Sequence, residues 1–199
     1  MRHQGGQVPI RTMKDDLQGS ISMSEDTIAS YIQALNNIFV VEDANAWNPD
    51  LRSATAVRTS PTRYFTDPSI GTAALGLGPG ALMSDLPTFG LFFETLCIRD
   101  LRVYADSLGG EVSHFRTKDN LECDAVVHLR DGRYGLVEIK LGGEKAVEYG
   151  AKTLLKVRTK LDTGKMGEPA FMMVLTAAGD YAYRRKDGVY VVPAGTLRD

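Results

Sequence analysis

The stretch from Leu121 to Lys140, LECDAVVHLRDGRYGLVEIK, predicts two β-strands joined by a tight turn at residues 130–132. Its apolar residues lie on both sides of that turn. Charged residues stand where buried strands seldom carry them: Asp124 on the first strand, and Glu138 and Lys140 at the end of the second. The stretch therefore predicts a hairpin that carries an acid, an acid and a lysine at one end.

An acid on one strand and an acid-x-lysine on the next are the residues that one- or two-metal phosphodiesterases use. Asp124 and Glu138 would bind Mg²⁺ through carboxylate oxygens. Lys140 would orient the attacking water and offset the developing negative charge. Taken alone, however, the pattern favours surface or ion-paired strand charges, because such spacings often arise by chance.

The length of the turn decides whether the two carboxylates share a face. A two-residue turn would place Asp124 and Glu138 on opposite faces of the hairpin. A three-residue loop that ends at a left-handed Gly132 would pair His128 with Tyr134 and bring both carboxylates, and the lysine with them, to one face. We predict the three-residue loop or an equivalent bulge.

The composition is that of an ordinary globular protein. With 199 residues and 43% hydrophobic content, the chain can form one large or two small domains with a real core. The 23 basic residues nearly balance the 25 acidic residues, so a nucleic-acid surface would have to be a local patch. Cys97 and Cys123 lack the spacing of a zinc site and predict reduced thiols in a cytoplasmic protein. The sequence predicts neither a secretion signal nor a membrane-spanning helix.

The N-terminal half predicts a small module. Residues 1–20 are polar and predict a tail or linker. A capping-box pattern at residues 22–25 predicts the start of a helix, which leads into a short strand at residues 39–41. A helix followed by a strand and a loop is typical of the end of a winged-helix module, so we predict a winged-helix-like module over residues 21–85.

Two loops of this half could be mistaken for ligand-binding segments. Arg52, Arg58 and Arg63 alternate with Ser and Thr, which favours a solvated loop over a wing or a phosphate-contacting loop. The glycine-rich run at residues 76–80 fails the dinucleotide fingerprint, and no P-loop lysine follows it. We interpret this run as a hinge between two domains.

Residues 86–199 predict a second domain with the order helix, strand, hairpin, helix, strand, strand. The first helix, residues 89–108, carries an apolar stripe with Glu94 beside it. Glycines end that helix, and an alternating strand at residues 111–116 precedes the hairpin. A helix over residues 143–161 follows, and then two apolar strands.

This order, with an acid on the first helix, Asp124 on the middle strand and Glu138-x-Lys140 on the next, resembles the PD-(D/E)XK or restriction-endonuclease-like superfamily. More specifically, most of the chain from about Ser22 onward is similar to the C-terminal portion of a prokaryotic AAA-type ATPase family, the one that ends in the domain of unknown function numbered 4143. The strings that carry the resemblance are SEDTIASYIQALNNIFVVEDANAWNP, RYFTDPS, FGLFFETLCIRDL, LECDAVVHLRDGRYGLVEIKLG and RRKDGVYVVP.

The resemblance implies a larger parent protein with a P-loop ATPase, a winged-helix-like module and then a nuclease-like domain. It implies that Glu94 is the first-helix acid, that Asp124 and Glu138 are the Mg²⁺ carboxylates, and that Lys140 is the water-positioning base. Cys123 stands where the motif's name has proline. The chain contains no Walker A string, so we expect no ATP site in it.

Two functions follow from these observations. The first is Mg²⁺-dependent phosphodiester hydrolysis of DNA or RNA. The second is a catalytically inactive DNA-binding or protein-docking module of the parent ATPase, suggested by the winged-helix pattern and by basic residues at 152, 156 and 160. Glu94 itself fits a salt bridge with Lys140 as well as a role as a metal ligand.

Overall fold

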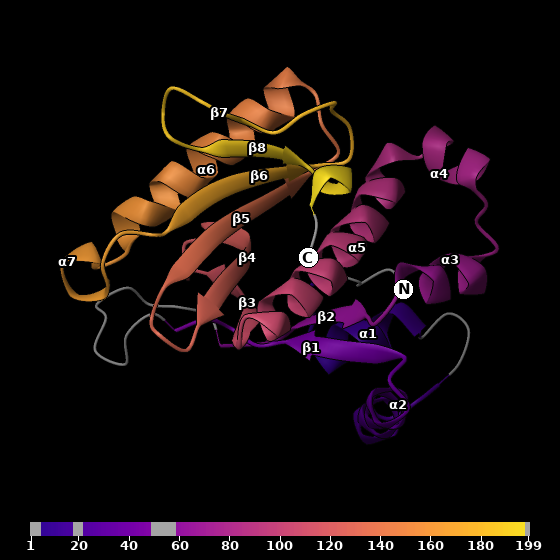
Figure 1. Ribbon diagram of the computed structural model, residues 1–199. Helices are drawn as coiled ribbons and strands as arrows, with labels where there is room; N and C mark the ends of the chain where they lie inside the picture. The colour runs from indigo at the N-terminus through magenta and orange to yellow at the C-terminus, as the bar shows by residue number, and fades with distance from the viewer. Residues whose placement is uncertain (1–4, 18–21, 49–58, 198–199) are drawn as a thin grey trace.

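A mixed sheet of six strands forms the centre of the C-terminal part of the molecule (Figure 1). The structure is a computed structural model, and it describes residues 5–17, 22–48 and 59–197. Strands β3, β4 and β5 are antiparallel neighbours, β6 and β8 continue the sheet parallel to β5, and β7 is antiparallel to β8. In the spatial order β3-β4-β5-β6-β8-β7, the strands are Gly110–Arg116, Glu122–Leu129, Tyr134–Lys140, Phe171–Thr176, Tyr190–Pro193 and Tyr183–Arg184.

Two long helices cover the two faces of this sheet, α5 (Leu86–Ser107) on one face and α6 (Glu144–Lys160) on the other (Figure 1). Successive side chains of a strand point to opposite faces. Leu136 of β5 therefore packs in the apolar cluster with α6, whereas Val137 packs in the cluster with α5. Because both faces are covered, β5 is buried along almost its whole length. The predicted mixed α/β sheet flanked by helices is confirmed.

The described residues of the N-terminal half form four helices and a two-stranded antiparallel sheet, β1-β2, which lies beside α5 (Figure 1). The short helices α3 and α4 both contact α5. The left-handed Gly76 ends α3, Leu77 and Gly78 join the two helices, and Pro79 and Gly80 form the start of α4. The bounds of these elements are α1 Ile10–Leu17, α2 Glu25–Asn37, β1 Val41–Ala44, β2 Thr62–Phe65, α3 Pro68–Leu75 and α4 Pro79–Ser84, and two further short elements, α7 Thr163–Met166 and the 3₁₀ helix Ala194–Thr196, belong to the C-terminal part.

Local details of this half differ from the sequence-based expectations. Residues 10–17, within the predicted tail, form the helix α1. Helix α2 is capped by Ser24, whose hydroxyl accepts a hydrogen bond from Thr27 N at 3.1 Å, so the predicted capping box begins two residues too early. The strand predicted from Phe39 begins at Val41, because Phe39 adopts a left-handed φ of 57° that an extended strand does not allow.

The N-terminal half shares its core with the sheet. Trp47 is buried, its backbone N–H donates to His114 O at 2.7 Å, and its ring lies 6.0 Å from that of Phe115. Tyr64 of β2 is buried in the same apolar cluster as Phe93 of α5. The two halves are therefore packed against each other directly over the end of the sheet where β4 begins.

Two further sequence-based expectations concern loops and membranes. The predicted loop with Arg52 and Arg58 lies outside the described residues. Within the part of the chain that the structure describes, no helix combines the length and apolar composition needed to cross a bilayer.

Candidate functional site

The β4–β5 turn has the three-residue loop that the sequence predicts. Leu129 N donates to Arg133 O at 2.8 Å, and Gly132 N donates to Leu129 O at 3.0 Å. Gly132 has a φ of +89°, which a residue with a side chain adopts only with strain. His128 pairs with Tyr134, so the predicted register is confirmed.

Asp124 lies at the point where β4 separates from β5. The last paired residues of the two strands are Ala125 and Val137. Two residues further along β5, the backbone N–H of Ile139 donates to Asp124 Oδ2 at 2.7 Å. The aspartate side chain thus takes the place of a backbone acceptor from the neighbouring strand, and it opens the sheet at this end.

Cys123 packs beside the last paired residues of β4 and β5, where the two strands separate. Its Sγ lies 3.2 Å from the carbonyl oxygens of both Ala125 and Val137. Burial raises the pKa of this thiol well above its ordinary value, with Glu138 and Asp124 adding to the shift. Cys123 therefore stays a neutral, structural thiol at the position where the motif's name has proline.

Lys140 joins the two carboxylates of the hairpin. Its Nζ lies 2.7 Å from Glu138 Oε2 and 3.2 Å from Asp124 Oδ2. The Glu138 side chain is only 3% exposed. Helix α6 covers it closely, since a Cβ added to Gly150 would lie 3.4 Å from the Cβ of Glu138. The second carboxylate oxygen of the glutamate, Oε1, is buried and has no hydrogen-bond partner among the described residues.

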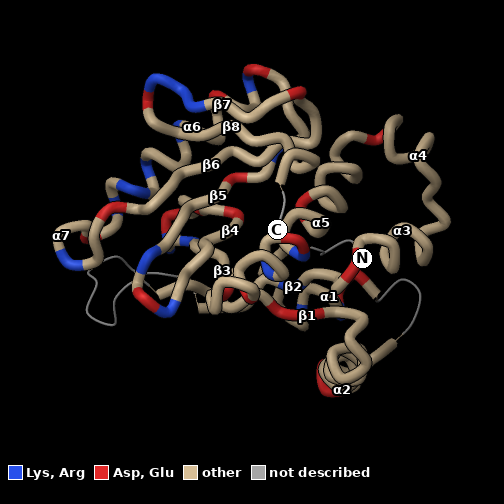
Figure 2. The backbone as a smooth tube through the Cα atoms, in the orientation of Figure 1, with Lys and Arg blue, Asp and Glu red and all other residues tan. Residues whose placement is uncertain are grey.

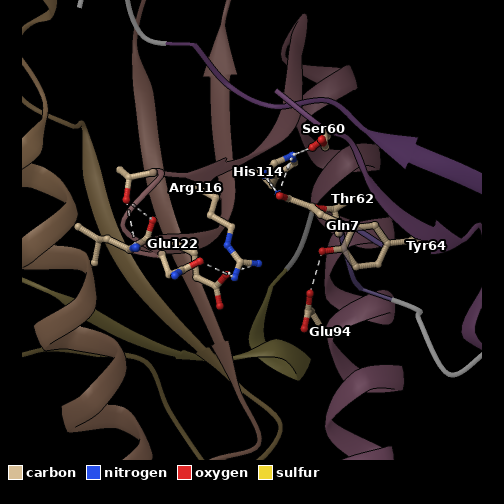
Figure 3. Close-up of polar contacts among 11 residues, drawn as sticks. Gln7, Ser60, Thr62, Tyr64, Glu94, His114, Arg116 and Glu122 are labelled. Carbon is tan, nitrogen blue, oxygen red and sulfur yellow. Dashed lines mark hydrogen bonds and ion pairs between the residues drawn. The ribbon is translucent and has the colours of Figure 1, made fainter. Parts of the chain in front are cut away.

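Glu94 lies on the other side of Asp124 and has a different partner. The Tyr64 hydroxyl donates to Glu94 Oε1 at 2.7 Å (Figure 3). Gly5 covers the same oxygen, because a Cβ added there would lie 3.4 Å from it. The structure thus pairs Lys140 with the two hairpin acids and pairs Glu94 with a tyrosine from the N-terminal half.

The acids outnumber the lysine, and the pKa values reflect this. Burial raises the pKa of Glu94 to about 8, and the charge of Asp124 adds to the shift. Burial and Asp124 likewise raise the pKa of Glu138 to about 8. Burial works to lower the pKa of Lys140, but Asp124 and Glu138 outweigh it and raise the pKa. The site therefore favours the binding of an additional positive charge or proton.

A small polar cavity of about 80 Å³ lies between the N-terminal half and this site, which is room for only a few water molecules. Glu94, Glu122 and Asp124 line its acidic side. Glu122 forms an ion pair with Arg116 at 3.2 Å, and the Nε of that arginine is buried with no hydrogen-bond partner in the part of the chain that the structure describes. Glu94, Glu122 and Asp124 therefore face one cavity, whereas Glu138 and Lys140 do not line it.

The opposite wall of the cavity consists of neutral polar groups (Figure 3). Burial lowers the pKa of His114, so its ring is neutral. His114 Nε2 lies 3.0 Å from Ser60 O and Nδ1 lies 3.1 Å from Gln7 Nε2, which fits a ring that donates to Ser60 and accepts from Gln7. Sequence periodicity gives no sign of these contacts, because Gln7 and His114 are 107 positions apart.

The donor chemistry of the hairpin fits Mg²⁺, although the arrangement is not that of a complete metal cage. Among the described residues, no three His, Cys, Asp or Glu side chains are grouped so as to hold a metal ion. Mg²⁺, however, is commonly bound through one or two carboxylates, with waters and substrate phosphates as the other ligands. Asp124 and Glu138 supply two such carboxylates, and Glu138 Oε1 is an unused acceptor.

Comparison with known families confirms one part of the resemblance drawn from the sequence, the domain of unknown function numbered 4143. The family model described as "Domain of unknown function (DUF4143)" matches residues 89–197, and a second, "Domain of unknown function (DUF8612)", matches residues 1–81. No curated protein and no solved structure matches the chain. Because the first match spans more than half of its length, the chain belongs to the DUF4143 family.

Proposed function

We propose that Asp124, Glu138 and Lys140 form the site of a metal-dependent phosphodiesterase that acts on nucleic acid. The observation that carries this proposal is the position of Lys140 Nζ between the two carboxylates, at the end of the sheet where β4 and β5 separate. Two acids share one lysine here, burial and Asp124 raise the pKa of Glu138 to about 8, and one oxygen of that glutamate has no partner among the described residues. Buried groups with such perturbed pKa values occur chiefly at functional sites.

Each residue has a role in this proposal. The carboxylates of Asp124 and Glu138 would hold Mg²⁺, which when bound supplies positive charge for the phosphate and acidity for a water ligand. The Lys140 ammonium would position the attacking water and stabilise negative charge on the phosphate. Glu94 would be a third acid beside Asp124, with which it lines the polar cavity.

The proposal includes the finer features that the sequence resemblance implies. The six-stranded sheet would be of the PD-(D/E)XK type, and the helices and two strands of the N-terminal half would be a winged-helix-like module. The whole protein would carry an AAA-type ATPase domain as an intramolecular partner. Cys97 and Cys123 are buried free thiols, which supports a reducing compartment such as the cytoplasm.

The direct test is to measure Mn²⁺ binding by calorimetry and nucleic-acid cleavage with Mg²⁺ or Mn²⁺. The substrates are plasmid, single-stranded DNA and RNA. We expect binding and cleavage by the natural sequence and the loss of both in Asp124→Asn, because the variant removes one carboxylate ligand. Asp106→Asn, which changes an exposed acid near the end of α5, is the matched control and should keep both activities. Cleavage that survives in Asp124→Asn would reject the site.

A second candidate, a catalytically inactive nucleic-acid-binding or docking module, is favoured by a different observation. Glu138 is buried beneath α6, so it does not face open solvent as substrate-contacting groups usually do, and Glu94, which is half-buried, accepts a hydrogen bond from Tyr64. The exposed face of α6 carries basic residues along its length (Figure 2). They include Lys152, Lys156 and Lys160, which are all exposed.

Salt-dependent binding of labelled DNA separates the two candidates. The second predicts binding without cleavage, weakened in the triple variant Lys152→Gln, Lys156→Gln, Lys160→Gln and unchanged in Asp124→Asn. Changing three phosphate-contacting lysines should also reduce the slope of log affinity against log salt. An unchanged slope would exclude α6 as the binding surface.

A further inference from the structure

The outer edge of the sheet at β7 carries two neighbouring aromatic rings that are open to solvent. Tyr181 precedes β7 and Tyr183 is its first residue, and the two tyrosines are 70% and 45% exposed. Their ring centroids lie 6.1 Å apart. Because β7 is the last strand of the sheet, its outer side pairs with no further strand among the described residues. The two rings are therefore accessible to a ligand.

The cross-strand register relates this edge to the proposed site. Glu138 of β5 pairs with Val174 of β6. The same row of partners continues through Val191 of β8 and ends at Tyr183. Residues paired in this way point to the same face and neighbouring strands lie about 4.8 Å apart, so Tyr183 lies about 14 Å from Glu138 on the face that also carries Lys140. This distance is short enough for one nucleic-acid strand to contact both the site and the tyrosines.

Basic residues lie beside the two tyrosines. Residues 184–186, Arg-Arg-Lys, follow Tyr183 directly. Arg185 Nη2 lies 2.6 Å from Glu148 Oε2 of α6, and Lys152 Nζ of that helix lies 3.2 Å from Oε1 of the same glutamate. The turn after β7 therefore lies against the basic face of α6 (Figure 2). Positive charge beside exposed aromatic rings complements a ligand that combines phosphates with planar bases.

We propose that the β7 edge binds single-stranded nucleic acid, with Tyr181 and Tyr183 stacking on unpaired bases and the neighbouring basic residues contacting phosphates. This inference rests on the proposed function, since it names the substrate class of the same site. In a duplex the bases are paired and stacked on one another, so only a single strand offers base faces to the two rings. The three consecutive basic residues favour a polyanion over a protein partner.

The test measures binding of a labelled oligonucleotide to the full chain by fluorescence anisotropy, as a single strand and as a duplex of the same sequence. Measurements in EDTA separate binding from the proposed metal-dependent cleavage. We expect the double variant Tyr181→Ala, Tyr183→Ala to bind the single strand at least about tenfold more weakly, because it removes both stacking rings, and to bind the duplex within about twofold of the natural sequence. Tyr31→Ala is the matched control. Its ring, on α2 in the N-terminal half, is 57% exposed, and its removal should leave both affinities unchanged.

The double variant Tyr181→Phe, Tyr183→Phe distinguishes stacking from other roles of the tyrosines. It keeps both rings and removes only the hydroxyls, so we expect single-strand affinity within about twofold of the natural sequence. Neither double variant removes a positive charge, so the slope of log affinity against log salt should stay the same, whereas Lys186→Gln should reduce it. Binding by the phenylalanine variant as weak as that by the alanine variant would overturn the inference, and so would an equal loss of affinity for single strand and duplex.

The remaining outcomes separate this inference from the proposed function. Single-strand binding that depends on the two tyrosines, in a protein that cleaves nothing with Mg²⁺ or Mn²⁺, would support the binding edge and reject the phosphodiesterase. Cleavage that is lost in Asp124→Asn, but is equal on single strands and duplexes and unchanged in the alanine variant, would leave the proposed function standing and overturn the inference. Unchanged single-strand affinity in the alanine variant would also overturn it and would leave the rings to a protein partner.

Discussion

Two clusters of charged residues in this protein follow opposite electrostatic rules. At the surface, Arg185 lies 2.6 Å from Glu148 and 2.9 Å from Asp187. Hydrogen bonds from Arg185 hold the pKa of both acids below their ordinary values. In the proposed site, Lys140 also contacts two acids, but burial raises the pKa of Glu138 to about 8.

The difference between the clusters lies in solvent and in charge balance. Around Arg185, water screens the charges and the fork of the guanidinium provides a donor for each acid. Around Lys140, a single ammonium faces Asp124 and Glu138, with Glu94 nearby, and little water is available. A buried cluster of unequal charges reduces stability, and proteins keep such clusters chiefly at functional sites. We therefore expect equivalent substitutions in the two clusters to change the free energy of unfolding by different amounts and with different signs.

The largest effect is expected from Lys140→Met, which removes the cation between Asp124 and Glu138. Leaving buried carboxylates without their partner should lower the free energy of unfolding by about 3 kcal/mol at neutral pH, as measured by urea denaturation. Lys156→Met, on the exposed face of α6, is the control and should change stability little. Equal stability of the two variants would mean that the acids of the site are already neutral, and the contrast between the clusters would fail.

A smaller effect of opposite sign is expected from Glu138→Gln. The amide is nearly isosteric, still accepts a hydrogen bond from Lys140, and no longer repels Asp124. Because the pKa of Glu138 is about 8, the comparison is made at pH 9, where the glutamate is charged. There we expect the free energy of unfolding to rise by about 1 kcal/mol, the usual pattern when a strained functional group is neutralised. Glu111→Gln, on the exposed side of β3, provides a baseline for glutamate replacement. Destabilisation by Glu138→Gln would show that its attraction to Lys140 outweighs the repulsion and burial.

The part of the site that lies on the hairpin could be predicted from the sequence. Glu138 and Lys140 are two residues apart on one strand and so share a face. The remaining question was the register, and Gly132 decided it, because a three-residue loop ending in a left-handed glycine aligns Asp124 with Glu138. Local periodicity and turn chemistry carry this information within twenty residues.

The contacts that other elements make with the acids of the site could not be predicted in the same way. Tyr64 meets Glu94 across 30 positions, and neither residue belongs to a local pattern that specifies the other. The burial of Glu138 depends on Gly150 of α6, where the absence of a side chain allows the helix to approach the sheet. Helix α1 was missed because it has only 8 residues, about two turns, so its amphipathic pattern is too short to stand out in a polar segment. Contacts between distant elements depend on packing, which single-sequence periodicity does not report.

The smallest effect is expected at the surface cluster, from Arg185→Gln. Exposed ion pairs contribute little, so the free energy of unfolding at neutral pH should fall by less than about 1 kcal/mol.

The pH dependence of the stability of Arg185→Gln is more informative. Asp187 and Glu148 have lowered pKa values in the folded state, so their contribution is present above their ordinary pKa values and is lost as the pH falls through the lowered ones. In Arg185→Gln, urea denaturation between pH 7 and pH 3 should therefore show a shallower loss of stability than in the natural sequence. If stability falls equally steeply with pH in both proteins, Arg185 and its two acids do not cause the loss of stability in acid. The surface cluster would then no longer serve as the comparison for the proposed site.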